Sequence, residues 1–235
     1  MSLPVAILAG GLATRLRPVT ENIPKALIDV AGKPFVVHQL ELLRARGVGR
    51  VVLCLGHLGE QVEALVGDGR RFGLDVDCAY DGDRLLGTGG ALRRALPALG
   101  DRFLVLYGDS YLDCDYADVA ARFVESGRLG LMTVFRNQGR WDSSNVVFKG
   151  GAVLRYGKTV KDPEMEYIDY GLGALRAEAF RPYSEGEPLD LATVYQDLLA
   201  RGELAGYEVG QRFYEIGSPQ GLEETRQHLE RREHA

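Results

Sequence analysis

The first 107 residues of the chain alternate between short apolar runs and longer segments with helical spacing. Runs rich in Val, Leu and Ile predict strands at 3–9, 51–55, 76–80 and 103–107. Apolar residues at helical spacing predict the helices between them, at 34–47, 58–67 and 89–99. Strands that alternate with helices are joined by βαβ crossovers, which build a parallel sheet. The alternation therefore predicts an α/β fold with a Rossmann-like, open and mostly parallel sheet.

After about residue 127 the pattern changes to short segments separated by turn residues. Strand-like segments lie at 130–137, 144–151, 152–158 and 167–175. Helical patterns follow at 189–201 and 220–232, with strand-like stretches at 204–209 and 212–217 between them. This spacing is typical of an antiparallel or mixed extension of the sheet. Because no linker rich in Pro or Ser separates the parts, we expect one domain over 1–235. Its first part is 1–126, and its second part, 127–235, holds a β-rich insertion and a C-terminal helix.

Charge and cysteine usage argue against several classes of protein. The net charge of −5 argues against a general nucleic-acid binder, which would carry a basic face. The start, "MSLPVAILAGG", lacks a basic segment and has only a short apolar run, so we expect neither a signal peptide nor a membrane span. Cys54, Cys78 and Cys114 are an odd number without a CxxC pair. The cysteines therefore predict reduced thiols and a cytoplasmic location. From the net charge and the N-terminal sequence we expect no nucleic-acid partner and no membrane partner.

Glycine makes up 30 of 235 residues, about twice its average usage of ~7%, which predicts glycines in turns and ligand loops. Gly10 and Gly11 follow the first strand, and ligands of open parallel sheets bind at the carboxyl ends of strands. Without Cβ atoms, these residues let backbone N–H groups approach an anion. Arg15 and Lys25 add positive charge behind them. The sequence contains neither GxxxxGK[ST] nor GxGxxG, so these residues alone leave a plain turn with solvated arginines as an alternative.

The longer string "LAGGLATRLRPVTENIPKALIDVAGKP" decides between these interpretations. It resembles the signature of the sugar-1-phosphate nucleotidylyltransferases, G-G-x-x-T-R-L-x-P-x-T-x-x-x-P-K-x-L-x-x-V-x-x-K-P. Members of that family join a nucleoside triphosphate to a sugar 1-phosphate and release pyrophosphate. The resemblance implies the nucleotide-diphospho-sugar transferase fold, with a nucleotide-binding half at 1–126 and a sugar-binding half at 127–235. The partners it implies are a nucleoside triphosphate and a sugar 1-phosphate.

The resemblance also assigns roles to the residues of this first loop. Gly10, Gly11, Thr14 and Arg15 are implied to cradle the triphosphate. Lys25 is implied to contact both the α-phosphate and the sugar phosphate. We expect Arg15 and Lys25 to be the catalytic residues, since in-line transfer between phosphates needs positioning and charge neutralisation, not a protein nucleophile.

Two carboxylates are implied to hold a magnesium ion. Asp109, in "FLVLYGDSYL", follows a strand and a glycine, and the family places a metal-binding aspartate there. The second family ligand is an aspartate in a late D-x-G-T-P element, which reads "FYEIGSPQGL" in this chain. Glu215 therefore replaces the aspartate, and Ser218 replaces the threonine. Glutamate also binds Mg²⁺, but its extra methylene leaves direct and water-mediated contact open.

The base is implied to bind at "DGDRLLGTGGAL", which resembles the family's L-G-T-x-G-A element. Gly87, Thr88 and Gly89 match it, with Leu8 and Ala9 as the opposite wall of the pocket. The alternative is a tight strand-to-helix turn without a ligand. The L-G-T-G-G string is most similar to the guanylyltransferase branch.

On the sugar side the resemblance is looser, and an ordinary structural role remains the alternative for each residue. "RWDSSNVVF" and "YIDYGLGAL" fall where the family contacts the hexose, and "YGKTVKDP" falls where it holds the sugar phosphate through a lysine. Lys158 is the preferred lysine, with Lys161 in reserve. The other expected sugar contacts are Ser144, Asn145, Asp169, Tyr170 and Gly171.

The two sugar-side strings look most similar to the heptose-1-phosphate guanylyltransferase subgroup. GTP with heptose or mannose 1-phosphate is therefore the preferred pair of substrates. A UTP- or CTP-dependent enzyme acting on another phosphate or phosphonate is the first alternative. A non-catalytic nucleotide sensor is the second, and the presence of Arg15, Lys25 and Asp109 together argues against it. We expect a monomer or homodimer.

Overall fold

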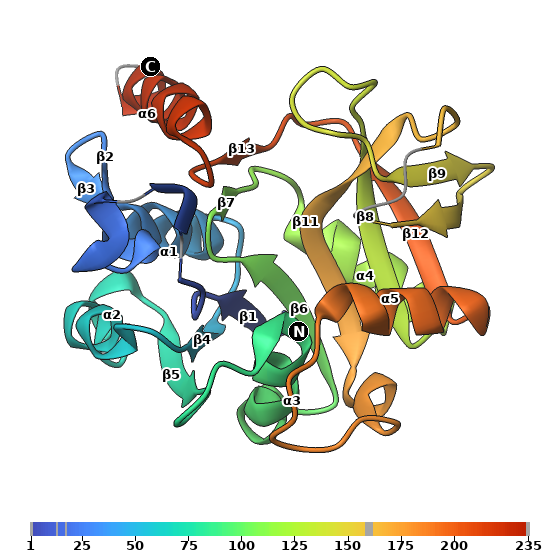
Figure 1. Cartoon of the computed structure of the whole chain (residues 1–235), viewed down its shortest axis with the longest axis horizontal. Helices are drawn as coiled ribbons and strands as arrows, with labels where there is room; N and C mark the ends of the chain where they lie inside the picture. Colours follow the sequence, from blue (N-terminus) through green and yellow to red (C-terminus); the bar gives the residue numbers. More distant parts are fainter. Residues whose placement is uncertain (1, 13, 17, 158–161, 234–235) are drawn as a thin grey trace.

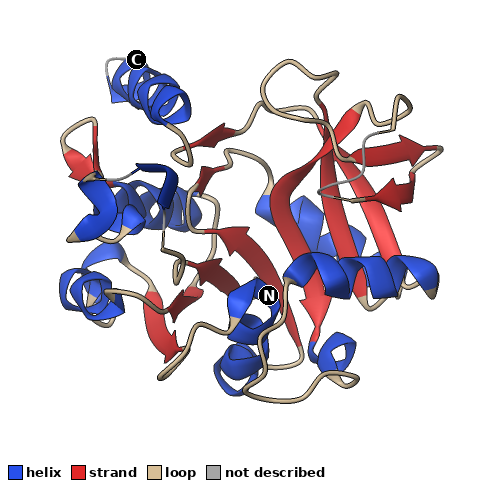
Figure 2. Ribbon diagram, in the orientation of Figure 1, coloured by secondary structure: helices blue, strands red, loops and turns tan. Residues whose placement is uncertain are grey.

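The computed structural model describes residues 2–12, 14–16, 18–157 and 162–233. Within these residues, nine strands join one mixed sheet (Figures 1 and 2). Its centre is a parallel quartet in the order β5-β4-β1-β6, and the strands are β1 (Val5–Leu8), β4 (Arg50–Leu55), β5 (Asp75–Tyr80) and β6 (Arg102–Tyr107). The strands predicted in the first part of the sequence are thereby confirmed.

Helices cover both faces of this quartet because its strands are apolar on both sides. In β1, Val5 and Ile7 contribute to one core and Ala6 to the other, as the period of two along a strand requires. The first core is covered by α1 (Phe35–Ala45), α2 (Gly59–Val66) and α4 (Tyr116–Ser126). The second is covered by α3 (Gly87–Leu99) and α5 (Leu191–Ala200).

The strand order places a topological switch point between β1 and β6. From β1 the chain passes to β4 on one side, and it later returns to β6 on the other side. The two strands approach closely where they end: a Cβ on Gly108 would lie 2.5 Å from the carbonyl oxygen of Leu8. Crevices at such points, outside the carboxyl ends of the strands, are where open α/β sheets bind ligands.

The second part of the chain extends the same sheet. The long strand β11 (Tyr167–Arg176) runs antiparallel to β6 and to β8 (Gly130–Arg136), and β12 (Leu204–Val209) pairs in parallel with β8. The hairpin of β9 (Val146–Lys149) and β10 (Ala152–Tyr156) joins the start of β11. The expected mixed extension is thus confirmed. It continues the central sheet, and the β9–β10 hairpin projects from it (Figure 1).

Short elements complete the fold. Two small pairs are β2 (Asp29–Val30) with β3 (Lys33–Pro34), and β7 (Ser110–Tyr111) with β13 (Tyr214–Glu215). The 3₁₀ turns are η1 (Thr14–Leu16), η2 (Val19–Glu21), η3 (Lys25–Leu27), η4 (Arg70–Phe72) and η5 (Ala177–Phe180). The last helix, α6 (Pro219–Glu233), packs on β13 and β2, over a third small core.

The sequence analysis does not predict helix α4, although the sequence contains the residues that begin and end it. Asp115 caps its first turn by accepting a hydrogen bond from the Asp118 N–H, and Gly127 ends it in a left-handed conformation. Within the described residues, no helix is both long and apolar enough to cross a membrane.

Candidate active site

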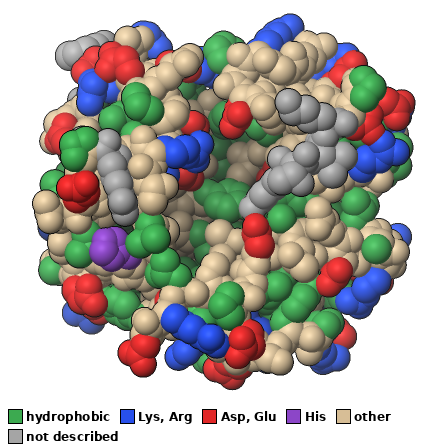
Figure 3. Space-filling view, viewed as in Figure 1, with side chains coloured by type: hydrophobic (Ala, Val, Ile, Leu, Met, Phe, Trp, Pro, Cys, Tyr) green, Lys and Arg blue, Asp and Glu red, His purple; other side chains and the backbone are tan. Residues whose placement is uncertain are grey.

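A cavity of about 240 Å³ opens at the switch point between β1 and β6. Figure 3 shows a hollow in the middle of this face, with hydrophobic side chains on its floor and charged groups at its rim. The cavity is lined by Leu8, Ala9, Gly10, Gly11, Lys25, Ala26, Cys54, Asp81, Leu85, Gly87, Thr88, Ala91, Tyr107, Gly108 and Asp109. Eight of the residues singled out from the sequence are among them: Leu8, Ala9, Gly10, Gly11, Lys25, Gly87, Thr88 and Asp109.

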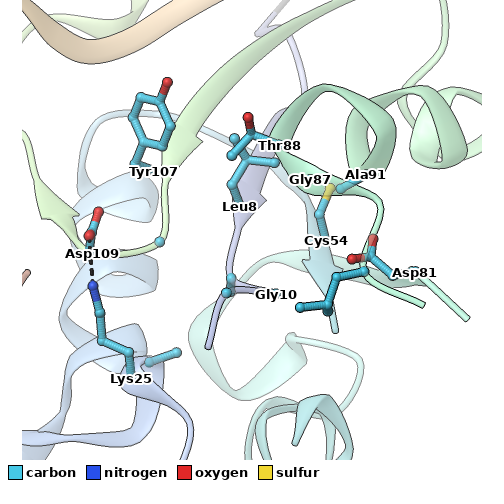
Figure 4. A pocket seen from close by; sticks show the side chains of 15 residues that line it. Leu8, Gly10, Lys25, Cys54, Asp81, Gly87, Thr88, Ala91, Tyr107 and Asp109 are labelled. Carbon is cyan, nitrogen blue, oxygen red and sulfur yellow. Dashed lines mark hydrogen bonds and ion pairs between the residues drawn. The ribbon is translucent and has the colours of Figure 1, made fainter. Parts of the chain in front are cut away.

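The charged end of the cavity is an ion pair between Lys25 and Asp109. The Lys25 Nζ lies 2.9 Å from the Asp109 Oδ2 (Figure 4), and the side chains are 18% and 27% exposed. Lys25 begins η3 directly after Pro24, and Asp109 follows β6 after Gly108. Both groups are half-buried and open to the cavity, so an incoming anion can reach the ammonium group.

A second carboxylate, Glu215, reaches this end of the site through strand pairing. β13 pairs with β7, which sets Glu215 opposite Ser110, and the Ile216 N–H donates to the Asp109 carbonyl oxygen at 2.9 Å. Burial, and next the field of Asp109, raise the pKa of Glu215, while Arg15 opposes this shift. Two carboxylates and the Arg15 guanidinium therefore share one electrostatic environment beside Lys25.

Two glycines make room for the longer glutamate side chain. A Cβ on Gly217 would collide with Oε2 of Glu215, and one on Gly221 would lie 2.9 Å from its Oε1. The hydroxyl of Ser218 donates to the same Oε1 at 3.3 Å, and the buried Thr225 hydroxyl donates to the Glu215 carbonyl oxygen at 2.9 Å. Glu215 is thus folded back into a cradle, and this accommodates the methylene that aspartate lacks.

Asp109 and Glu215 fit the needs of a magnesium ion. Mg²⁺ is usually bound by one or two carboxylates, with the remaining positions taken by water and substrate phosphates. Burial and the negative charge of Asp109 both disfavour an ionised Glu215, and a cation held by these two residues would offset both effects. No cluster of three or more His, Cys, Asp or Glu ligands occurs in the described part of the chain.

The other end of the cavity contains a carboxylate that the sequence analysis missed. Asp81 follows β5, is 5% exposed, and accepts a hydrogen bond from the Leu86 N–H through Oδ2 at 3.1 Å. Burial raises its pKa. Cys54 lies near it, and burial raises the pKa of that thiol to about 12, so the thiol is neutral (Figure 4). The position of Asp81 at a strand's carboxyl end, like that of Asp109, is the signal that could have identified it.

The start of α3 is only partly available to a ligand. Gly87 and Thr88 line the cavity, but the Gly89 N–H donates to the Leu189 carbonyl oxygen at 2.8 Å. A Cβ on Gly89 would lie 2.8 Å from the Leu189 side chain. Gly89 therefore serves the close approach of residues 189–191 in this structure. The Thr88 hydroxyl also bonds to that segment, donating to Asp190 at 3.1 Å.

The sugar-side residues form a connected group beyond Tyr107. The side-chain oxygen of Asn145 accepts a hydrogen bond from the Asp169 N–H at 2.8 Å, and the Tyr156 hydroxyl donates to the Asp169 carboxylate at 3.4 Å. Gly171 has a φ of 94°, and a Cβ there would lie 3.4 Å from the Tyr107 ring. Together these contacts bring Asn145, Asp169 and Gly171 to the side of the cavity that Tyr107 borders.

Within the part of the chain that the structure describes, this connected group does not include the three other residues that the sequence predicts as sugar contacts. The Ser144 hydroxyl accepts hydrogen bonds from the Asn137 amide and the Gly139 N–H, so it orders its own loop. The Tyr170 ring is buried beside Phe135 in the first core, so a contact with sugar would have to use its backbone. Lys158, with its reserve Lys161, lies outside the described residues.

Thr14 and Arg15, on η1, do not line the cavity itself in the part of the chain that the structure describes. Arg15 points toward the Glu215 cradle: its Nη2 would lie 3.3 Å from a Cβ on Gly217. This brings its charge to the Glu215 carboxylate, where it opposes the rise in pKa.

Comparison with known proteins adds to this geometry. A family model described as nucleotidyl transferase matches residues 5–149. A UTP–glucose-1-phosphate uridylyltransferase from Synechocystis sp. is 29% identical over 223 residues, which are 88% of this chain and 58% of that protein. The catalytic subunit beta of mannose-1-phosphate guanylyltransferase from Danio rerio is 29% identical over 227 residues, or 91% of this chain and 61% of that protein. The chain thus spans about three fifths of the length of these two relatives.

Among solved structures, HddC from Yersinia pseudotuberculosis complexed with GMP-PN is similar over 97% of this chain and 99% of that one. The TM-score is 0.78 and the sequence identity 25%. This similarity confirms the expected fold, with the second part of the chain included.

Proposed function

The chain belongs to the nucleotidyl transferase family, and on that premise we propose that it transfers a nucleotidyl group from a nucleoside triphosphate to a sugar 1-phosphate. An oxygen of the sugar phosphate attacks the α-phosphorus, the bond from that phosphorus to the β-phosphate bridging oxygen breaks, and pyrophosphate leaves. The observation that carries the proposal is the Lys25–Asp109 pair at the switch point, with Glu215 and Arg15 beside it.

Lys25 is the residue that meets both phosphates. Its ammonium group is half-buried and faces the cavity, where a positive charge is screened less than in water. It neutralises charge on the α-phosphate as the pentavalent geometry forms, and it draws the sugar phosphate to the same point. No described side chain has to act as a nucleophile in this scheme.

The first loop holds the rest of the triphosphate. The N–H groups of Gly10 and Gly11 offer donors at the end of β1, and a Cβ on Gly10 would crowd the Gly56 nitrogen at 3.0 Å. Thr14 and Arg15 add a hydroxyl and a bidentate cation for the outer phosphates. Asp109 and Glu215 would hold Mg²⁺, which supplies charge neutralisation for the transferring group when bound.

Asp81 supports a guanine base. A carboxylate accepts hydrogen bonds in a pair, and guanine offers two adjacent donors, N1–H and the N2 amino group. Uracil offers one N3–H donor between two carbonyl oxygens, which the carboxylate would repel. GTP is therefore the preferred nucleotide, in agreement with the guanylyltransferase relative and the GMP-PN complex of HddC.

The preferred acceptor is heptose or mannose 1-phosphate. Asn145, Asp169 and Gly171 would contact its hydroxyls, together with the backbone of Tyr170. Ser144 would support the loop, and Lys158 would hold the phosphate. Gly87 and Thr88 would border the base with Leu8 and Ala9, and Gly89 would shape that wall.

A uridylyltransferase is the second candidate, because the Synechocystis relative uses UTP according to its name and matches most of this chain. A matrix of four ribonucleoside triphosphates against a panel of sugar 1-phosphates, assayed for pyrophosphate release with Mg²⁺, separates the candidates. GTP with heptose or mannose 1-phosphate is expected to be fastest. Preference for UTP would select the second candidate, and no release with any pair would leave a nucleotide sensor.

We further infer a cytoplasmic enzyme that works as a monomer or homodimer. All three cysteines are free thiols, as in proteins of reducing compartments. Size-exclusion chromatography with light scattering gives the oligomeric state.

A further inference from the structure

Trp141 is the only tryptophan in the sequence, and it lies on the loop at residues 137–145 between β8 and β9. Its side chain remains 46% exposed. The guanidinium carbon of Arg212, from the segment before β13, lies 3.4 Å from the centre of its ring. A cation over the face of tryptophan at this distance is a favourable cation–π contact. The contact joins two segments that are far apart in the sequence.

Arg212 is held in place from its other sides. It also lies over the Tyr214 ring, 4.6 Å from its centre, and it forms an ion pair with Glu224 of α6. Tyr214 in turn stacks on His228 of α6, with ring centres 3.9 Å apart and planes at 15°. The guanidinium is therefore a fixed platform anchored on α6, and Trp141 is the member of the stack that the loop supplies.

The loop that carries Trp141 is ordered by its own hydrogen bonds. The fully buried Asn137 donates from its amide to the Asp142 carbonyl oxygen at 2.6 Å and to the Ser144 hydroxyl at 3.1 Å. The side-chain oxygen of Asn137 accepts a hydrogen bond from the backbone N–H of Trp141 at 3.3 Å. Because these bonds tie the two ends of the loop together, fixing the Trp141 ring also fixes the residues on either side.

Both ends of this connection reach the proposed active site. Tyr214 directly precedes Glu215, and the stack borders a small cavity of about 70 Å³ that also includes Asp142 and Glu215. At the far end of the loop, Asn145 accepts the hydrogen bond from the Asp169 N–H.

We propose that Trp141 is a positioning residue: by stacking on Arg212 it fixes the loop at residues 137–145 against the segment that carries Glu215. The stack thereby sets the sugar side of the site relative to the metal side. Trp141 stays 46% exposed at the surface, and the stack on Arg212 is the contact that orients its ring. The effect on the reaction rests on the proposed function, whereas the hold on the loop does not.

The hold can be measured without any substrate, because Trp141 is the sole source of tryptophan fluorescence. Acrylamide quenching is compared in the wild-type protein, Arg212→Gln and Arg212→Lys. We expect the quenching constant to rise and the emission to shift to the red in both variants, because lysine keeps the charge but lacks the planar group. Leu154→Ala is the control, since Leu154 is 56% exposed on β10 in the same part of the sheet.

Steady-state kinetics then test whether the contact between Trp141 and Arg212 affects the proposed reaction. For Trp141→Ala we expect the KM for the sugar 1-phosphate to rise about tenfold, a loss within the range of a partly desolvated cation–π contact. The KM for the nucleotide should change by less than about twofold, because the loop lies away from the base pocket. Trp141→Phe, which keeps a planar ring, should recover most of the loss, and Leu154→Ala should match the wild type.

Two results would overturn the proposal, and each is separate from a failure of the proposed function. Unchanged quenching in Arg212→Gln would mean that Arg212 does not hold the ring. Equal effects of Trp141→Ala on both KM values, or none on either, would mean that the loop is not positioned for the sugar phosphate. If the wild-type protein releases no pyrophosphate with any substrate pair, the proposed function fails, while the quenching experiment still decides whether the stack holds the loop.

Discussion

The two sides of the proposed site are built in different ways. The phosphate side is made within the first 109 residues, where β1 and β6 end side by side and Lys25 meets Asp109. The sugar-side rim is assembled from the loop at 137–145, the start of β11 and the segment before α6, joined by side-chain contacts such as Trp141 on Arg212. The phosphate side therefore depends on backbone geometry and charge, and the rim depends on contacts between distant segments.

This difference suggests a division of tasks. Charge neutralisation at a phosphate is the same for every substrate of the reaction class, so it can be built into the sheet itself. The rim can differ between related proteins while the sheet stays the same, because it is carried on connecting segments. Substitutions on the phosphate side should thus affect turnover, and substitutions on the rim should affect the choice and affinity of the sugar.

The largest effect is expected at Lys25. Lys25→Ala removes the charge that we propose meets both phosphates, and we expect kcat to fall by roughly 10³-fold or more. Pyrophosphate release at saturating substrate measures it, with circular dichroism to show that the protein is folded. Lys33→Ala is the matched control from the same stretch, since Lys33 pairs with Glu41 outside the cavity. A loss below about tenfold in Lys25→Ala would show that another residue carries the charge.

Glu215, where the two sides meet, is the next test. We expect Glu215→Gln to lower turnover by roughly 10²-fold and to raise the Mg²⁺ concentration needed for half-maximal rate, because an amide is a weaker ligand. Glu215→Asp should retain turnover within about tenfold if the carboxylate binds the metal directly. Titration of the rate with Mg²⁺ measures both variants. A folded but inactive Glu215→Asp protein would indicate that the longer side chain has another task in its glycine cradle.

A smaller effect is expected in the base pocket. Asp81→Asn should lower kcat/KM for GTP by roughly 5- to 150-fold, the loss of one bidentate contact, and should affect UTP less. Asp83→Asn serves as the control, since Asp83 lies exposed in the same loop. Equal losses for GTP and UTP would mean that Asp81 supports the loop and does not read the base.

The smallest effect concerns stability and pH. The pKa of Glu215 is raised from 4.5, so between that value and the raised one the folded protein keeps a proton that the unfolded chain has released. The stability contributed by this group is therefore fully present below pH 4.5 and is lost as the pH rises through the folded-state pKa. The Glu215→Gln protein has no carboxyl group to titrate at this position, so it does not show this loss of stability with rising pH.

We expect Glu215→Gln to melt at a higher temperature than the wild type at pH 8, where the wild-type group has lost this contribution. The difference should disappear below pH 4.5. Differential scanning fluorimetry without divalent ions measures it, and Glu230→Gln, an exposed position on α6, is the control. A gap that stays constant with pH would contradict the electrostatic origin of the shift.

The same division explains how much the sequence could predict. The strands and helices of the parallel quartet, and Lys25 and Asp109 with them, follow from local patterns and from the family resemblance. Both kinds of signal are strongest where the backbone itself forms the site. Asp81 opens the string "DGDRLLGTGGAL" but precedes its L-G-T-x-G-A element, so the resemblance does not single it out, although it lies at a strand end as Asp109 does.

For the rim and for the base pocket, sequence position is a weaker guide. Tyr170 and Gly171 are neighbours on β11, but the side chain of Tyr170 enters the first core because successive residues of a strand face opposite sides. Gly89 was expected at the base, and its N–H is instead taken by Leu189 from a segment far along the chain. The stack of Trp141, Arg212 and Tyr214 could not be predicted for the same reason.

The central claim is that the α-phosphate of a nucleotide and a sugar phosphate are joined at Lys25 and Asp109. The most direct test follows GTP, Mg²⁺ and mannose or heptose 1-phosphate by ³¹P nuclear magnetic resonance, with the wild-type protein and Lys25→Ala in parallel. We predict that the wild type produces pyrophosphate together with a new, coupled pair of diphosphate resonances from a nucleotide sugar, and that Lys25→Ala produces neither at a comparable rate. A wild-type reaction that shows no coupled diphosphate product with these or the other ribonucleoside triphosphates, or a Lys25→Ala reaction as fast as the wild type, would contradict the claim.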